Sequence, residues 1–84
     1  MYELEYTKKA KEQLQKTSKD LGERIIRSLE RIRIRPFSFV KRLMGSKYFR
    51  LRVGDYRLIL DIQRRKLIIL VIEIGHRRNI YKRI

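Results

Sequence analysis

The segment Gly75–Tyr81, with the sequence Gly-His-Arg-Arg-Asn-Ile-Tyr, places reactive side chains directly after a run of almost unbroken apolar residues. His76 is the only histidine of the chain, and an imidazole exchanges a proton readily near neutral pH. The two arginines of the segment keep their charge at neutral pH, and planar guanidinium groups suit phosphate. Either this segment is a solvated tail, or it is where the chain carries out its chemistry.

Metal chemistry is not indicated by the sequence. The chain has no cysteine, so neither disulfides nor thiolate metal sites are expected. Its single histidine and scattered carboxylates show no spacing typical of metal ligands. We therefore expect a protein that works without a metal or another cofactor.

The charge balance indicates a polyanionic partner. The chain has 23 Lys and Arg against 9 Asp and Glu, which gives a formal net charge of +14. Such an excess on a small domain is typical of contact with nucleic acid, because neutralised phosphates release counterions. Solubility alone does not require one sign to dominate so heavily. Such a chain is also expected to need an acidic partner that neutralises it when it is idle.

The length of 84 residues predicts a single domain, residues 1–84, with a compact core. The N-terminal segment Met1–Glu5 is acidic and does not resemble a signal peptide. The longest apolar run, Leu67–Ile72, is much shorter than the roughly 20 residues that a membrane helix needs. We expect a soluble, cytoplasmic protein without membrane association.

Two helices are predicted after a short N-terminal strand. The stretch Tyr2–Tyr6 alternates apolar and charged residues, as a half-buried strand does. Thr7 is positioned to cap a helix over residues 8–16, and Ser18 is positioned to cap a second helix. Pro36 ends the second helix. The apolar stripe of that helix recurs at helical spacing: Leu21, Ile25, Leu29 and Ile32.

Three further strands are predicted in the second half of the chain. Lys47–Val53 and Tyr56–Ile62 flank Gly54-Asp55, which is a two-residue hairpin signal. Leu67–Ile74 is typical of a strand that is buried on both faces. The predicted fold class is therefore α+β, in the order β-α-α-β-β-β. A small, twisted, mainly antiparallel four-stranded sheet carries a helical hairpin on one face.

The hairpin register predicts where the arginines point. If Gly54 and Asp55 form the loop, Arg52 lies beside Arg57 on the face that the helices leave open, and Arg50 lies there beside Ile59. Like charges directly opposite each other destabilise a sheet, so binding of a polyanion is the expected gain. The opposite, apolar face then pairs Val53 with Tyr56, Leu51 with Leu58, and Phe49 with Leu60.

The register of the last strand decides the side of Glu73. A two-residue loop at Arg64-Arg65 would send Glu73, Gly75 and Arg77 to the helix side, where a charge is badly placed. A three-residue loop or a bulge would put all three on the arginine face and bring Arg77 towards Arg57. We favour the second arrangement. It predicts the core residues of this strand as Ile68, Leu70, Ile72 and Ile74.

Two motifs carry a resemblance that extends over essentially the whole chain. The stretches Y-F-R-L-R-V-G-D-Y-R-L-I-L and V-I-E-I-G-H-R-R-N-I-Y, after a charged helical hairpin, resemble those of RelE-like toxins of the RelE/ParE superfamily. RelE-like members belong to toxin–antitoxin modules and cleave mRNA in the ribosomal A site. The resemblance implies a metal-independent endoribonuclease in which the 2′-hydroxyl attacks the adjacent phosphorus. It also implies a cognate acidic RelB-like antitoxin that masks the basic face, in an expected heterotetramer.

The resemblance assigns roles to individual residues. Arg57 matches the arginine that binds the scissile phosphate, and Arg77 matches a second arginine near the leaving oxygen. Tyr81 matches the tyrosine that stacks on or orients the mRNA nucleotide. Arg50 stands where the best-studied branch has a lysine, and His76 stands where branches have lysine or histidine.

Proton transfer is the step on which the chain departs from the family pattern. Arginine keeps its proton, so Arg50 is a poor general base but still stabilises charge. We expect electrostatic stabilisation from Arg57, Arg77 and Arg50, with His76 or Tyr81 handling the proton. Further basic residues are expected to contact RNA or the ribosome without choosing bases: Lys41, Arg42, Lys47, Arg52 and Arg78.

Two other functions stay open. A ParE-like toxin of the same superfamily would act on DNA gyrase by protein contact, without nuclease chemistry. Such members usually lack the constellation of Arg57, Arg77 and Tyr81 that this chain keeps. A basic RNA-binding structural protein would explain the net charge, but not why Arg50, Arg57 and Arg77 should converge.

Overall fold

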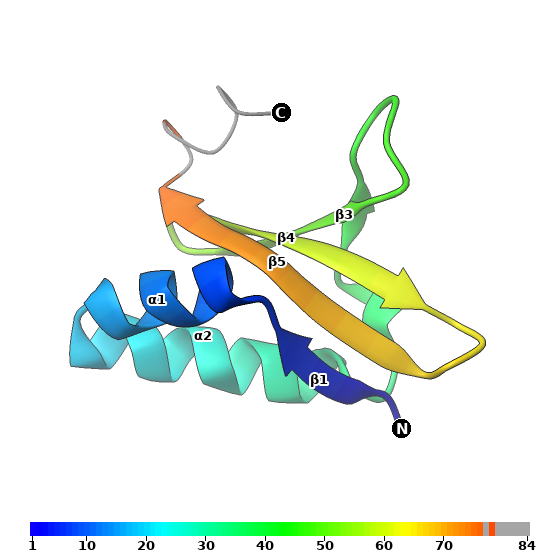
Figure 1. The fold of residues 1–84 in the computed structure, drawn as a ribbon, viewed down its shortest axis with the longest axis horizontal. Helices are drawn as coiled ribbons and strands as arrows, with labels where there is room; N and C mark the ends of the chain where they lie inside the picture. The colour runs from blue at the N-terminus through cyan, green and yellow to red at the C-terminus, as the bar shows by residue number, and fades with distance from the viewer. Residues whose placement is uncertain (77, 79–84) are drawn as a thin grey trace.

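A computed structural model of the chain describes residues 1–76 and residue 78. Helices α1 and α2 lie side by side against one face of a five-stranded sheet (Figure 1). No helix in this part of the chain is long and apolar enough to cross a membrane. The elements are β1 (Glu3–Tyr6), α1 (Lys8–Lys16), α2 (Lys19–Ile32), the 3₁₀ helix η1 (Pro36–Ser38), β2 (Lys41–Arg42), β3 (Phe49–Val53), β4 (Tyr56–Gln63) and β5 (Ile68–His76).

The sheet order is β1-β5-β4-β3-β2, with β1 parallel to β5 and the other neighbours antiparallel. The α+β class and the helical hairpin on one face are confirmed. The fifth strand, β2, was not predicted. It has only two residues, which pair with Arg50 and Phe49 of β3, and two residues are too short for an alternation to be recognised.

Capping residues start both helices as predicted. The hydroxyl oxygen of Thr7 accepts a hydrogen bond from the backbone N–H of Ala10 at 3.1 Å. The same hydroxyl donates to the carbonyl of Ile72 at 2.8 Å, so the start of α1 is tied to β5. Ser18 accepts from the N–H of Leu21 at 3.3 Å and caps α2.

The core lies between the helices and the sheet. Ile25, Leu29 and Ile32 of α2 are almost fully buried, as the helical stripe predicts, and α1 contributes Ala10. The sheet side of this core consists of inward-facing residues of β3, β4 and β5: Leu51, Val53, Leu58, Leu60, Ile62, Ile69, Val71 and Ile74.

The predicted hairpin register is confirmed in full, with Arg52 opposite Arg57 and Arg50 opposite Ile59. In β5, Gly75 pairs with Arg57 and Glu73 pairs with Ile59, so both lie on the arginine face as predicted. Both residues reach this face because β5 contains a bulge in its middle, opposite Ile59 and Leu60.

The bulge overturns most of the predicted core of the last strand. Leu60 pairs with Val71, and Ile62 pairs with Ile69, so Ile69 and Val71 are fully buried in the core. The predicted core residues Ile68, Leu70 and Ile72 are only partly buried. Ile74, beyond the bulge, is in the core as predicted.

Where β1 ends, side chains at the start of α1 and within it form hydrogen bonds with the backbone of β5. Strand β1 pairs with β5 only as far as Val71. Beyond that point, the backbone N–H of the buried Ile74 donates to the side-chain Oε1 of Gln13 at 2.7 Å. The carbonyl of Ile72 accepts from Thr7. These side chains replace a strand partner, because a buried backbone group left unpaired is costly.

Replacement of Gln13 by leucine is expected to lower the free energy of unfolding by about 1–3 kcal/mol, because the N–H of Ile74 loses its acceptor. Urea denaturation followed by circular dichroism measures the change. The matched control is Gln15→Leu, at an exposed position of the same helix, which is expected to change stability by less than about 0.5 kcal/mol. Equal effects of the two substitutions would contradict this assignment.

Candidate active site on the open face of the sheet

Two rows of side chains cross the face of the sheet that the helices leave open. The first row runs from Arg52 on β3 through Arg57 on β4 to Gly75 on β5. Gly75, at the end of this row, contributes no side chain of its own beside Arg57. The second row runs through Arg50, Ile59 and Glu73. The sheet therefore presents three arginines together, as the hairpin predicts.

Arg57 is held in place by the hairpin turn. Its side chain is only 4% exposed, and it is the one buried charged residue among those described. The Nη1 group donates to the carbonyl of Tyr56 at 3.0 Å and to the carbonyl of Gly54 at 3.3 Å. Gly54 adopts a φ of 58°, which glycine tolerates without strain. A guanidinium fixed in this way stabilises charge without reorganising.

His76 does not join the arginines. It pairs with Tyr56 in the register of β4 and β5, and successive side chains of a strand alternate between the faces. The imidazole packs edge-to-face on the ring of Tyr56, with 5.6 Å between ring centroids, and Tyr56 packs against the core. His76 therefore lies on the side of the sheet opposite Arg57.

A backbone contact also sets the tautomer of His76. The N–H of Arg78 donates to Nδ1 of His76 at 3.3 Å. An Nδ1 that accepts a hydrogen bond carries no proton, so the neutral ring carries its proton on Nε2. The two other predicted residues of this segment, Arg77 and Tyr81, lie outside the described residues.

The predicted RNA-binding residues Lys41, Arg42 and Lys47 surround the loop between β2 and β3, which stands out from the sheet (Figure 1). All three are exposed. Arg42 donates through Nε to the carbonyl of Ser46 at 3.2 Å. The Nζ of Lys47 lies 5.5 Å from the centre of the Tyr48 ring. Arg52 and Arg78 are also exposed, at two other points of the molecule.

A pocket of about 390 Å³ lies where this loop meets the sheet. Its carboxylate comes from Glu73, whose side chain is 13% exposed and forms an ion pair with Lys9 at 2.8 Å. No pattern in the sequence predicts this pocket, because residues from a loop and from two strands form it together. The lining residues are Met44, Gly45, Ser46, Tyr48, Ile59, Ile72 and Glu73.

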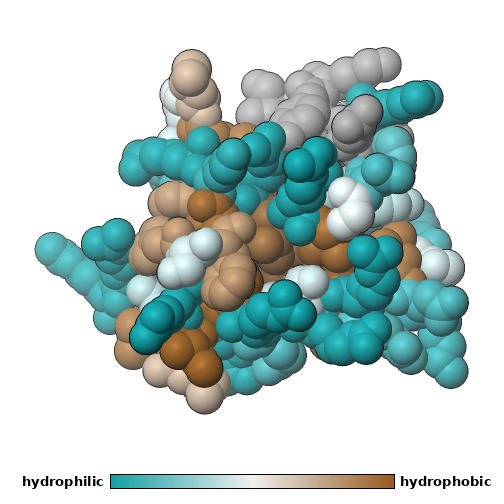
Figure 2. Space-filling model, turned by 180° about the vertical axis from the view of Figure 1, so that it is seen from behind, coloured by the Kyte–Doolittle hydropathy of each residue, from teal (hydrophilic) through white to brown (hydrophobic). Residues whose placement is uncertain are grey.

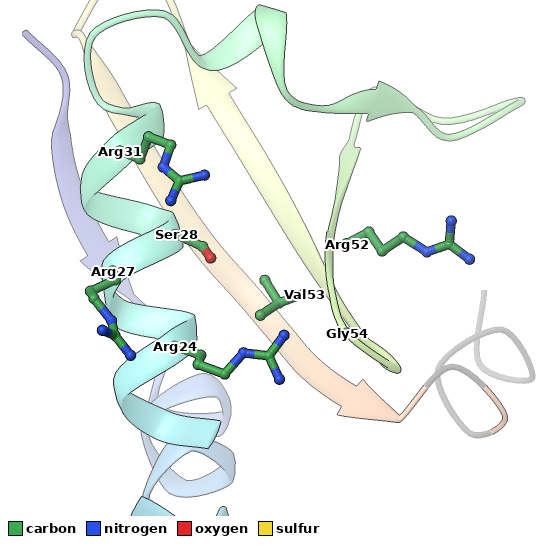
Figure 3. Close-up of a pocket in the computed structure, with 7 residues that line it drawn as sticks. All are labelled: Arg24, Arg27, Ser28, Arg31, Arg52, Val53 and Gly54. Carbon is green, nitrogen blue, oxygen red and sulfur yellow. The ribbon is translucent and has the colours of Figure 1, made fainter. Parts of the chain in front are cut away.

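A basic groove of about 410 Å³ lies on the other side of the molecule, between α2 and β3. Arg24 and Arg31 extend from α2 towards β3, whereas Arg52 points away from the groove (Figure 3). The adjoining hollow is lined by Ile32, Phe39 and Leu51, among others. From behind, the surface shows a hydrophobic area that hydrophilic side chains surround (Figure 2). The groove thus combines a cationic rim with an apolar floor.

Metal ligands are not gathered anywhere in the described part of the chain: it holds no group of three or more His, Cys, Asp or Glu side chains that could bind an ion. The charges that surround the candidate site are instead guanidinium groups. These are suited to phosphate by their planar arrangement of donors.

Comparisons with known proteins agree on one superfamily. A family model described as ParE toxin of type II toxin–antitoxin system, parDE, matches residues 4–81. No curated protein matches the chain in sequence.

Three solved structures share the fold. RelE of the intact E. coli RelBE toxin–antitoxin complex is 20% identical, with a TM-score of 0.80 over 90% of this chain and 96% of that one. The archaeal RelE–RelB complex from Pyrococcus horikoshii gives 24% identity and a TM-score of 0.80, covering 93% and 97%. The RelBE2 toxin–antitoxin complex from Mycobacterium tuberculosis gives 22% identity and a TM-score of 0.80, covering 90% of this chain and 98% of that one.

The opposed pair of Arg52 and Arg57 is expected to cost stability. Replacement of Arg52 by glutamine should raise the free energy of unfolding by about 0.2–1 kcal/mol at low ionic strength, because it removes repulsion between cross-strand neighbours. The gain should shrink in 1 M NaCl, where the screening length is about 3 Å. Arg35→Gln, at an exposed position outside the sheet, serves as the control. Urea titrations at both salt concentrations measure the difference, and a loss of stability in Arg52→Gln would contradict the repulsion.

Proposed function

The chain belongs to the family of ParE toxins of type II toxin–antitoxin systems, and from this premise we propose that it is a ribosome-dependent endoribonuclease. Its substrate is mRNA in the ribosomal A site, and its effect is to stop translation in the cytoplasm. The observation that carries the proposal is the gathering of Arg50, Arg52 and Arg57 on one open face of the sheet. Repulsion within such a cluster destabilises the sheet, and binding of a phosphate chain would offset this repulsion.

The reaction is a transfer of phosphorus from one oxygen to another. The 2′-hydroxyl oxygen of one nucleotide attacks the adjacent phosphorus and loses its proton. The bond from phosphorus to the 5′-oxygen of the next nucleotide breaks, and that oxygen takes up a proton. The products are a 2′,3′-cyclic phosphate and a 5′-hydroxyl. Negative charge grows on the phosphoryl oxygens in the transition state, so fixed positive charge near them lowers the barrier.

Arg57 is the main candidate for this stabilisation. Its guanidinium is anchored by two backbone carbonyls of the hairpin, and its cross-strand neighbour on β5 is Gly75. Arg50 and Arg77 are assigned to the neighbouring phosphate oxygens and to the leaving oxygen. Because His76 packs against Tyr56 on the other side of the sheet, we assign proton transfer to Tyr81, with His76 as the second candidate.

A cognate acidic antitoxin is the proposed partner in the idle state. The net charge of +14 supports an acidic partner. The groove between α2 and β3 offers an amphipathic segment both apolar contacts and cations. The RelE structures of similar fold come from complexes with RelB antitoxins. We propose a toxin–antitoxin heterotetramer in which such a partner masks the basic surfaces.

A second candidate function is favoured by the family description, which names ParE toxins. In that case the chain would bind DNA gyrase and would not cleave RNA. The arginine face would then be a protein-binding surface. The two functions differ in a single observable, which is whether mRNA is cut.

Replacement of Arg57 by alanine is expected to lower the rate of mRNA cleavage by about 10²–10³-fold, because a fixed charge-stabilising group is lost. Primer extension on an mRNA incubated with ribosomes and the protein measures the cuts. Arg35→Ala, at an exposed position away from the open face, is the control and should cleave normally.

The outcomes of this experiment separate the two functions. Cuts in the A-site codon that disappear in a folded Arg57→Ala variant support the ribonuclease. Circular dichroism and urea denaturation establish that the variant is folded. Inhibited translation with intact mRNA would make the arginine face a binding surface. Unaffected translation would favour the second candidate function, a toxin that acts on DNA gyrase.

Binding of the antitoxin is expected to depend on the groove. The double replacement of Arg24 and Arg31 by glutamine should weaken the complex with the cognate antitoxin by at least about tenfold, because charge pairs across an interface are lost. The affinity of the unaltered protein should also fall with added salt. Isothermal titration calorimetry measures both effects. Lys8 and Lys11 are exposed on α1, and their replacement by glutamine is the control with an equal loss of charge.

A further inference from the structure

The distance between the two rows on the open face is similar to the distance between the phosphate and the base of one nucleotide. Arg57 and Ile59 stand two residues apart on β4 and face the same side. Two residues of a strand span about 6.8 Å. A phosphate and the base of the same nucleotide are separated by a similar distance, because only a ribose lies between them. A phosphate held by the arginines of the first row can therefore place a flanking base over the second row.

The pocket beside the second row has the lining that a nucleobase requires. Its volume of about 390 Å³ falls within the range of small-ligand sites, about 300–1,000 Å³. Ile59, which is 4% exposed, and Ile72 provide an apolar surface, and Tyr48 adds an aromatic ring. Bases in single-stranded RNA are held by stacking on aromatic rings and by hydrogen bonds to their edges.

Glu73 is the charged hydrogen-bonding group of this pocket, which also holds the hydroxyl groups of Ser46 and Tyr48. An ionised carboxylate only accepts hydrogen bonds, so it selects partners that donate. Lys9 holds its Oε1 at 2.8 Å, which fixes the position of the carboxylate from the α1 side. At one ring position, cytosine (N4) and adenine (N6) carry an exocyclic amino group that donates, whereas uracil carries the acceptor oxygen O4 there, which a carboxylate repels.

We propose that this pocket binds one of the two bases that flank the cleaved phosphate, and that Glu73 makes it prefer cytosine or adenine, which present an amino group to the carboxylate, over uracil, which presents an oxygen. This inference rests on the proposed ribonuclease function. It adds a base preference to that function, which the arginines cannot supply because phosphate contacts carry no sequence information.

Sequencing of the cleaved 5′ ends from a mixed mRNA pool tests the preference. In the unaltered protein, uracil at one flanking position should be cut at least about tenfold less often than cytosine, as expected for a specific base contact. In Glu73→Gln, whose amide both donates and accepts, the ratio should approach one while cutting persists. Glu12→Gln, at an exposed position of α1, should keep the original ratio.

A purely structural role of Glu73 predicts something different. If Glu73 only ties β5 to α1 through Lys9, then Glu73→Gln and Lys9→Gln should lower stability in urea alike, and neither should change the base ratio. That result would overturn the proposal. Tyr48 gives a second check: Tyr48→Ala should cut all sequences less, because stacking tolerates any base, and Tyr48→Phe, which keeps an aromatic ring, should lose less activity than Tyr48→Ala.

A binding measurement separates failure of this inference from failure of the proposed function. Cytidine 3′-monophosphate and uridine 3′-monophosphate are titrated into the purified protein and followed by NMR. The cytidine nucleotide should bind about tenfold more tightly, and the difference should vanish in Glu73→Gln. If the protein cuts no mRNA but shows this difference, the pocket stands and the ribonuclease does not. Equal affinities in the unaltered protein would overturn the pocket in either case.

Discussion

The bulge in the middle of β5 determines which side chains of the sheet face the helices and which face outwards. A strand that is apolar along most of its length has no alternation to fix which residues face the core. The extra residue opposite Ile59 and Leu60 resets the alternation. Val71 and Ile74 therefore both reach the core, while Glu73 faces outwards. Gln13 and Thr7 of the neighbouring helix and loop complete the hydrogen bonds along this part of the strand.

The open face follows from this constraint as a compromise between folding and binding. With the bulge, one row gathers Arg52 and Arg57 beside a glycine, and the next row adds Arg50 and Glu73. The first row concentrates charge of one sign, which opposes folding. Its cost is limited because Arg57 donates to backbone carbonyls of its own hairpin. A charge held by the backbone stays fixed in the absence of a ligand, which is what electrostatic catalysis requires.

Local patterns predicted what local physics decides. The Gly54-Asp55 turn sets the register of β3 and β4, so the positions of Arg50, Arg52 and Arg57 followed from the sequence, as did both helix caps. The core residues of β5 could not be predicted in this way, because the residue types of an apolar strand do not show where a bulge lies. His76 was expected to be a candidate for proton transfer beside the arginines, whereas the alternation of β5 places it against Tyr56. The pocket at Glu73 was missed because a distant loop closes it.

The two sides of the molecule meet at the edge formed by β3. Strand β2 pairs only with Phe49 and Arg50, so within the described sheet the backbone of residues 51–53 has no strand beyond it. Arg52 lines the helix-side groove through its position on this edge, yet its side chain points away from that groove (Figure 3). An acidic partner seated in the groove can therefore reach the arginine face by crossing the edge of β3. Inhibition would then need no contact with the anchored guanidinium of Arg57, because neutralising Arg52 already weakens the positive field of this face towards any polyanion.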